Sequence, residues 1–304
     1  MRKLSLAAAA IACVLSASAG AEAKTLGIVA LLANDALNID VINGASEAAK
    51  AAGWDVKVID TQESADKANA AIRGARPDFT LREVELLPPV LAPEKILCIG
   101  INYANRNADY GDQEIPKYPS MFYRAPNSLV AHAQPLVRPR ESEQLDYEGE
   151  IALVIGKAGR RIAAESALEH IAGVTLCNEG TIRDWIRHGK FNVTQGKNWD
   201  ATGAIGPWIA TGDEVDLTKP LHLTVKLNGE VTQDDTTENL IKSFAELIAY
   251  VSTFMTLKAG DIIVTGTPVK QKRAEAPVWL KPGDVVEVAC PQIGVLRNEV
   301  VAEQ

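Results

Sequence analysis

The chain has 304 residues, a formal net charge of −8 at pH 7 and 47% hydrophobic residues. This length and apolar content allow one or two globular domains with a buried core. The acidic balance excludes nucleic acid and anionic membrane surfaces as main partners, because both repel a negatively charged protein.

The N-terminus has the pattern of a secretory signal. Two basic residues follow the initial Met and precede an alanine-rich apolar run from Leu4 to Ser18. Ala21-Glu22-Ala23 is a small-x-small cleavage site. The run is too short to span a bilayer. We therefore predict a signal peptide over residues 1–23 and a periplasmic or secreted protein without membrane contact after cleavage.

Residues 24–75 predict a small α/β unit. The continuous apolar run over residues 25–32 is typical of a buried strand. Residues 38–52 form an alanine-rich amphipathic pattern that predicts a helix, and residues 54–60 alternate as a second strand. Residues 64–73 predict another short helix. The expected order is therefore βαβα.

The export signal, the run GIVALLANDALNIDVINGASEAAKAAGWDVKVID and the following SADKANAAI resemble the opening of periplasmic sugar-binding proteins of the ribose-binding type. The resemblance covers about 50 residues. A sugar-binding cleft needs two lobes, which require several times that length. An exported sugar-binding protein is therefore the weaker alternative for this chain.

Beyond a proline-rich linker at residues 76–94, residues 95–304 predict a mainly β domain. Asn228-Gly229 predicts a tight hairpin. Helices are few, and we predict them over residues 164–172 and 240–255. The predicted strands, separated by Gly and Pro, include residues 96–99, 151–155, 221–227, 262–264 and 285–290. This pattern indicates a mixed-to-antiparallel β architecture with peripheral helices.

Three acidic residues predict a metal site. Side chains alternate along a strand, so Glu148 and Glu150 in the predicted strand Leu145–Lys157 point the same way. Two unpaired buried carboxylates would be costly, so we expect a cation between them, such as Mg²⁺ or Mn²⁺. The alternative is an exposed strand end with solvated glutamates. Glu179, just past the predicted strand Ile171–Cys177, supplies a third carboxylate and favours the metal.

Six sequence blocks occur in order after Lys95. They are Gly100-Ile101-Asn102-Tyr103, Asp146-Tyr147-Glu148-Gly149-Glu150, Cys177-Asn178-Glu179 with Arg183-Asp184, Gly196-Lys197-Asn198-Trp199-Asp200, Gly206-Pro207-Trp208, and Gly260 to Pro268. Together they resemble the fumarylacetoacetate hydrolase superfamily. The resemblance implies a rolled β-sandwich, usually in a cytoplasmic homodimer, with Mg²⁺ or Mn²⁺ on Glu148, Glu150 and Glu179. The third position is most often Asp in that family, so Glu179 is longer by one methylene.

The resemblance also implies a 2-oxo acid or β-diketo acid substrate that chelates the metal and reacts through an enolate. An enolate can lead to C–C cleavage, decarboxylation, hydration or isomerisation, and the metal site alone does not choose among them. Lys197 matches the family lysine and is a candidate catalytic cation, with Asp200 to orient it. Thr267 and nearby backbone N–H groups are candidates for binding the substrate carboxylate.

One departure from the family bears on the reaction. Members that hydrolyse C–C bonds often carry a water-activating His and Glu where this chain has Arg106 and Asp109. Arginine stays protonated and cannot act as a general base. We therefore favour hydratase, isomerase or decarboxylase chemistry, with acylpyruvate or fumarylacetoacetate hydrolysis as the alternative. Arg106 and Arg124 suggest a dianionic substrate, and His188 is the first candidate for a replacement base.

Overall fold

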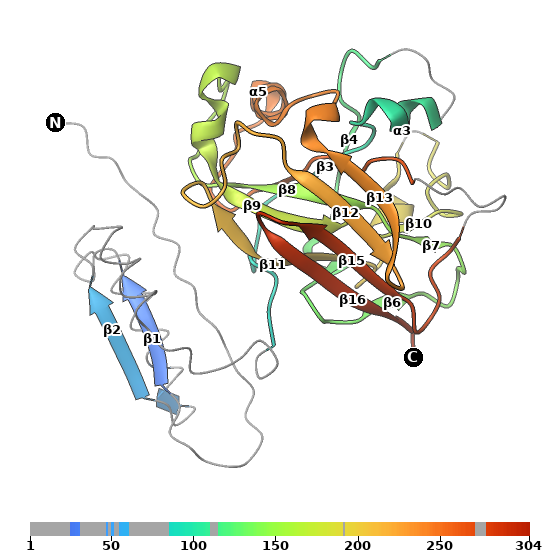
Figure 1. Cartoon of the computed structure of the whole chain (residues 1–304), viewed down its shortest axis with the longest axis horizontal. Coiled ribbons are helices and arrows are strands. Elements are labelled where there is room, and N and C mark those ends of the chain that lie inside the picture. Colours follow the sequence, from blue (N-terminus) through green and yellow to red (C-terminus); the bar gives the residue numbers. More distant parts are fainter. Residues whose placement is uncertain are drawn as a thin grey trace. The chain divides into compact units, whose positions relative to one another are not determined.

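A computed structural model describes residues 25–30, 55–60, 85–109, 115–190, 192–270 and 278–304, together with the helical positions 47, 50 and 51. The chain divides into two compact units, Met1–Glu85 and Leu86–Gln304 (Figure 1). The predicted signal peptide over residues 1–23 and the predicted helix over residues 64–73 lie outside the described residues.

In the first unit, strand β1 (Thr25–Ala30) pairs in parallel with β2 (Asp55–Asp60). Parallel neighbours need a crossover connection, and the helical positions 47, 50 and 51 lie in it. The described part of this unit therefore has the predicted order of strand, helix and strand.

The second unit contains two large sheets among its described residues. The seven-stranded sheet has the order β4 (Met121–Tyr123), β3 (Ile96–Ile99), β14 (Ile262–Val264), β8 (Gly149–Ile155), β9 (Ile171–Asn178), β11 (Gly203–Thr211) and β5 (Leu129–Val130). The five-stranded sheet has the order β13 (Glu230–Thr236), β12 (His222–Leu227), β15 (Val285–Cys290), β16 (Gly294–Ala302) and β6 (Leu136–Arg138).

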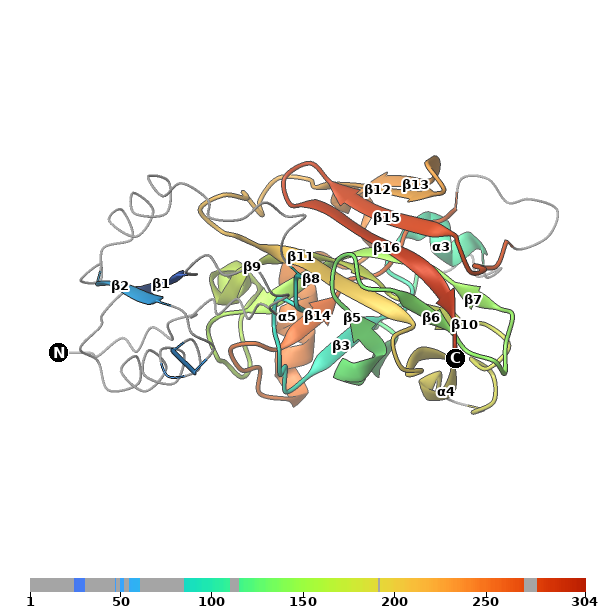
Figure 2. The ribbon, with the colours of Figure 1, turned by 90° about the horizontal axis from the view of Figure 1, so that it is seen from below.

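The two sheets pack face to face around the core. Figure 2 shows β12, β13, β15 and β16 as a layer over β8, β9 and β11. Gly149 at the start of β8 faces Val225 and Val288 of the opposite sheet, and a Cβ on Gly149 would fall 2.2 Å from the Val225 side chain. Every residue of β8 is buried. The predicted mainly β, rolled-sandwich fold is therefore confirmed.

Most of the strand predictions in this domain are confirmed. The strands predicted over residues 96–99, 151–155, 221–227, 262–264 and 285–290 each coincide with an observed strand, to within two residues at their ends. The longer strand predicted over Leu145–Lys157 is instead two strands, β7 (Leu145–Asp146) and β8, because Tyr147 and Glu148 between them are not paired in a sheet. Asn228 and Gly229 have φ values of 52° and 85°, as a tight primed turn requires, and they join β12 to β13.

The helix predictions need correction. Helix α5 spans Phe244–Phe254, because Ser243 accepts a bond from the Glu246 amide and caps it. The helix predicted over residues 164–172 is a 3-10 helix, η2 (Ala164–His170), and it ends before residue 172 because β9 begins at Ile171. Two short helices carry site residues that periodicity did not reveal, α3 (Ala104–Asp109) and α4 (Thr194–Lys197).

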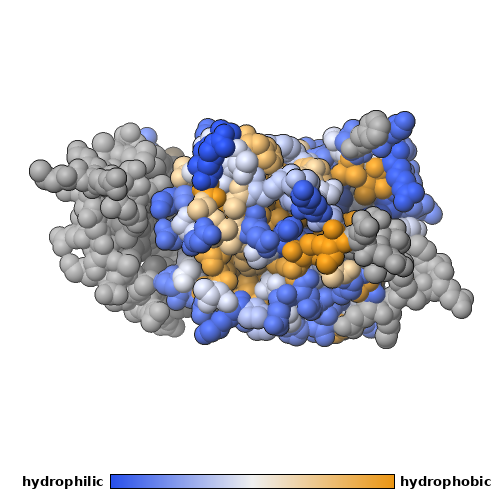
Figure 3. All heavy atoms as spheres, turned by 90° about the horizontal axis from the view of Figure 1, so that it is seen from above, coloured by the Kyte–Doolittle hydropathy of each residue, from blue (hydrophilic) through white to orange (hydrophobic). Residues whose placement is uncertain are grey.

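Polar and apolar side chains are mixed on the surface of the described residues. On the face in Figure 3, hydrophobic patches alternate with hydrophilic ones, which is ordinary for a folded protein. No helix in the described residues is long and apolar enough to cross a bilayer.

Gly180 tests how tightly the chain packs beside Glu179. A Cβ at Gly180 would lie 1.7 Å from the Thr202 carbonyl oxygen, whereas one at Gly212 would have no neighbour within 4 Å. Gly180→Ala is therefore expected to lower the free energy of unfolding by about 1–3 kcal/mol or more. Gly212→Ala should leave it unchanged or raise it by up to about 1 kcal/mol. Denaturant unfolding measures both, and equal midpoints would contradict the packing described.

Candidate active site

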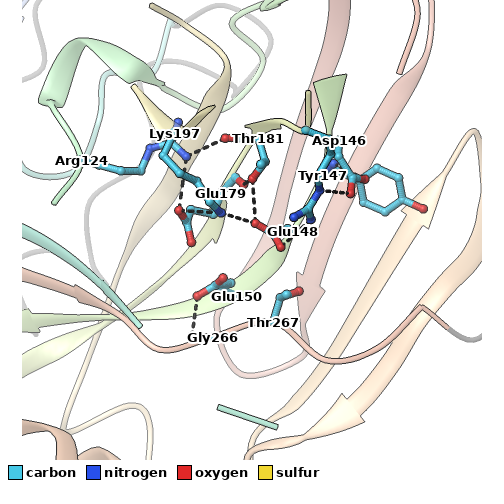
Figure 4. Close-up of polar contacts among 12 residues, drawn as sticks. Arg124, Asp146, Tyr147, Glu148, Glu150, Glu179, Thr181, Lys197, Gly266 and Thr267 are labelled. Carbon is cyan, nitrogen blue, oxygen red and sulfur yellow. Dashed lines mark hydrogen bonds and ion pairs between the residues drawn. The ribbon is translucent and has the colours of Figure 1, made fainter. Parts of the chain in front are cut away.

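The carboxylate of Glu148 is buried and accepts hydrogen bonds from four side chains (Figure 4). Oε1 accepts from Arg183 Nη2 at 2.7 Å and from Arg106 Nη2 at 3.2 Å. Oε2 accepts from Thr181 Oγ1 at 2.8 Å and from Lys197 Nζ. The four donors come from α3, β10 (Thr181–Ile182), the turn after β10, and α4. Glu148 therefore joins four segments of the chain.

Backbone pairing brings the acidic residues together. Strands β8 and β9 run antiparallel, with Glu150 opposite Cys177. At their ends the Glu179 amide donates to the Glu148 carbonyl at 2.7 Å, and the Glu148 amide donates to Asn178 Oδ1 at 3.0 Å. Strand β7 (Leu145–Asp146) then pairs with β10. This pairing places Glu148 and Glu179 side by side.

Burial destabilises the charged forms of Glu148 and Lys197, and neighbouring groups of opposite charge stabilise them. Burial alone would raise the pKa of Glu148, but the charges of Arg183, Lys197 and Arg106 hold that pKa well below its usual value. Burial alone would lower the pKa of Lys197, but Glu148 and Glu179 raise it. Both groups are therefore charged at neutral pH.

Glu179 faces two cations. Its Oε1 lies 3.1 Å from Lys197 Nζ and 3.6 Å from Arg124 Nη1. Arg124 also donates to the Gly180 carbonyl at 2.8 Å and to Ser128 Oγ at 3.0 Å. Arg124 is buried, and these contacts are all with protein groups. Its visible role is to hold Glu179, whereas we predicted that Arg124 binds substrate.

Glu150 is the least compensated acid of the group. Its carboxylate accepts a hydrogen bond from the Gly266 amide, and among the described residues no cation lies within ion-pair distance of it. Burial, followed by the charges of Glu179 and Glu148, raises the pKa of Glu150 well above its usual value. Thr267 lies beside Gly266, and Gln233 Nε2 donates to its hydroxyl at 2.9 Å. Without a bound cation, Glu150 is thus the carboxyl group of the three that most favours its protonated form.

The three carboxylates are ligands of the type that a hard divalent cation prefers. Their charges act on one another, and Glu179 Oε1 is buried without a hydrogen bond although it faces Lys197 and Arg124. Oxygen ligands of this kind are those that Mg²⁺ and Mn²⁺ take. No three His, Cys, Asp or Glu side chains among the described residues already stand in a metal-holding arrangement. The cations expected beside Glu148 are here Lys197, Arg106 and Arg183.

Two predicted catalytic residues do not contact this group. Asp200 is exposed and accepts a hydrogen bond from Asn127, so it does not orient Lys197. His188 is exposed, and its ring packs against Trp185 with centroids 4.3 Å apart. No hydrogen bond or ion pair in the described chain links His188 to the carboxylates. The side chain of Asp109, which stands where hydrolytic family members often carry a Glu, lies outside the described part.

Sequence reasoning missed several partners of the carboxylates. Asp146 Oδ2 accepts from Arg183 Nε at 2.8 Å, and Asp146 Oδ1 accepts from Lys270 Nζ. Asp146 and Arg183 lie in the recognised blocks, which could have drawn attention to them. Thr181 and Lys270 had no such signal. Ion pairs therefore link positive and negative side chains alternately, in the order Lys270, Asp146, Arg183, Glu148, Lys197 and Glu179.

The chain belongs to the fumarylacetoacetate hydrolase family, because the family model described as Fumarylacetoacetate (FAA) hydrolase C-terminal matches residues 95–301. The predicted family is therefore confirmed for the second unit. The match does not reach residues 24–75, so the likeness of that stretch to sugar-binding proteins stays a prediction.

Several relatives within this family are isomerases or tautomerases. The chain is 37% identical over 240 residues to the mitochondrial oxaloacetate tautomerase FAHD2A of Homo sapiens, covering 77% of this chain and 75% of that protein. It is 38% identical over 228 residues to the oxaloacetate tautomerase YisK of Bacillus subtilis, covering 73% and 75%. The crystal structure of a 5-carboxymethyl-2-hydroxymuconate delta-isomerase from Mycobacterium smegmatis matches with a TM-score of 0.65 and 31% identity, covering 76% and 87%.

The buried lysine gives a stability prediction. Lys197→Met should lower the free energy of unfolding by about 3–5 kcal/mol, because Glu148 and Glu179 stay buried with one cation fewer. The control is Lys219→Met, which breaks an exposed pair with Asp216 at 3.2 Å and should change nothing measurable. Denaturant unfolding in the presence of EDTA measures both. A parental midpoint for Lys197→Met would show that this ammonium does not stabilise the carboxylates.

Proposed function

We propose that the protein is a Mg²⁺- or Mn²⁺-dependent keto–enol tautomerase that acts on a 2-oxo acid of the oxaloacetate type. The observation that carries this proposal is Arg106, whose guanidinium is bonded to Glu148 at 3.2 Å. It stands where hydrolytic relatives often carry the water-activating histidine. Tautomerisation moves a proton between carbon and oxygen and needs no activated water, so a permanently protonated residue is compatible with it.

Glu148, Glu150 and Glu179 would hold the metal ion. When bound, the ion supplies a Lewis acid for the keto group of a 2-oxo acid. A divalent cation would also give Glu150 a positive partner in direct contact, whereas among the described residues the charge of Lys197 acts on it only from beyond ion-pair distance. The names of the tautomerase relatives support the same substrate class.

Lys197 supplies a fixed positive charge in this proposal. An ammonium group has three donors. One of them donates to Glu148, and Glu179 lies at ion-pair distance. A remaining donor can bond a substrate oxygen, where it stabilises the negative charge of an enolate. Its raised pKa keeps the group charged, so Lys197 acts as a hydrogen-bond donor and not as a base. The backbone and hydroxyl of Thr267 are the candidates for the substrate carboxylate.

Metal binding is testable with three single variants. Glu148→Gln, Glu150→Gln and Glu179→Gln should each weaken Mn²⁺ binding by at least about 10–100-fold. That is the loss of affinity typical when a residue that only hydrogen-bonds to a metal ligand is mutated, and the ligands themselves should matter at least as much. Asp200→Asn is the control, since Asp200 is exposed and bonded to Asn127. Titration calorimetry measures the affinities. Parental affinity in all three variants would rule out this metal site.

The reaction itself is tested by solvent deuterium exchange at C3 of oxaloacetate. With Mg²⁺, the protein should accelerate exchange above a control containing Mg²⁺ alone, while acylpyruvate hydrolysis stays slow. Arg106→His combined with Asp109→Glu should raise hydrolysis by up to about 10²–10⁴-fold, the usual contribution of a general base. Proton NMR follows the exchange. Fast hydrolysis by the parent, without accelerated exchange, would favour the C–C hydrolase alternative.

A further inference from the structure

Lys270 lies at the edge of the candidate site and has no part in the chemistry described so far. It follows β14 in the same segment that presents the Gly266 amide to Glu150. Its ammonium contacts Asp146 and lies 3.7 Å from the centroid of the Tyr147 ring. The Lys270 side chain is 20% exposed, so its ammonium group is accessible from solvent.

Asp146 does not balance the cations around it. Its carboxylate faces both the Lys270 ammonium and the Arg183 guanidinium, the latter at 2.8 Å. The same guanidinium donates to Glu148 at 2.7 Å. One negative charge at Asp146 therefore meets two positive charges, of which Arg183 is shared with Glu148. The surplus charge lies at Lys270, a single guanidinium away from Glu148.

The arginines first expected to bind a second carboxylate serve other groups. Arg106 donates to Glu148, and Arg124 is buried beside Glu179 with hydrogen bonds to Gly180 and Ser128. Burial lowers the pKa of Lys270, although Asp146 opposes that shift. A further anion beside this ammonium would offset the cost of burying it.

We propose that Lys270 binds the second carboxylate of a 2-oxo dicarboxylic acid and makes the enzyme selective for such substrates over 2-oxo acids with an uncharged far end. This inference rests on the proposed function, which places the 2-oxo end at Glu148, Glu150 and Glu179. Arg183 contacts both Glu148 and Asp146, the partner of Lys270, so a short dicarboxylate bound at Glu148 would extend past Arg183 toward Lys270. The Tyr147 ring and Asp146 hold the ammonium in place on its other sides.

The test uses two substrates that differ only at the far end, oxaloacetate and its 4-methyl ester. The rate of C3 deuterium exchange with Mg²⁺ is measured for the parent, Lys270→Met and Lys270→Arg. Lys270→Met should lower kcat/KM for oxaloacetate by about 10–100-fold, the worth of one charged hydrogen bond, and leave the ester unchanged. Lys270→Arg keeps the charge and should retain most of the preference. Lys219→Met is the surface control, and melting temperatures confirm that each variant is folded.

Calorimetric binding of both compounds in the presence of Mg²⁺ gives a second readout that does not depend on turnover. If Lys270→Met lowers kcat/KM and affinity equally for oxaloacetate and for the ester, the inference is overturned, because Lys270 would then only support Asp146. Undiminished preference for oxaloacetate would overturn it too. If the parent exchanges neither compound, the proposed function fails. The binding data then decide the inference. It stands if the parent binds oxaloacetate more tightly than the ester and Lys270→Met loses that preference. Any other binding result overturns it.

Discussion

The buried carboxylate of Glu148 is the constraint on which the site depends. A buried charge is stable only when it is paired and hydrogen-bonded, and Glu148 meets this condition through Arg106, Thr181, Arg183 and Lys197. Thr181 lies in β10, which pairs with β7, whereas Arg106 and Lys197 lie on the short helices α3 and α4. One buried carboxylate therefore brings three cations from different segments of the chain together.

Glu150 is buried too, but among the described residues no cation pairs with it. This contrast with Glu148 underlies the chemistry we propose. Glu148 has a lowered pKa because cations surround it, whereas Glu150 has a raised pKa because burial and its acidic neighbours dominate. A divalent cation would supply the positive neighbour that Glu150 lacks at ion-pair distance among the described residues. Surplus positive charge at Lys270 suits a second carboxylate on the substrate. The two features together match a metal-chelating dicarboxylic acid.

The sheet makes this arrangement possible. Strand β8 is buried along its whole length between β14 and β9, so its start is held rigidly where Glu148 and Glu150 emerge. Gly180 carries no side chain because the Thr202 carbonyl occupies that space, and its own carbonyl accepts a bond from Arg124. Close backbone packing around Glu179 leaves the acid little freedom to move.

The sequence by itself determined several strands of the second unit, the Asn228-Gly229 turn and the family, because alternation, apolar runs and turn residues are local signals. It also singled out the three acids that the sheet brings together. Only the tertiary structure decided which cations pair with Glu148, since they lie 35 to 49 residues away in the chain. It also showed that Asp200 accepts a hydrogen bond from Asn127 and that Lys270 donates one to Asp146. Short helices such as α4 and ion pairs between distant residues have no sequence period, because packing and charge, and not local propensity, stabilise them.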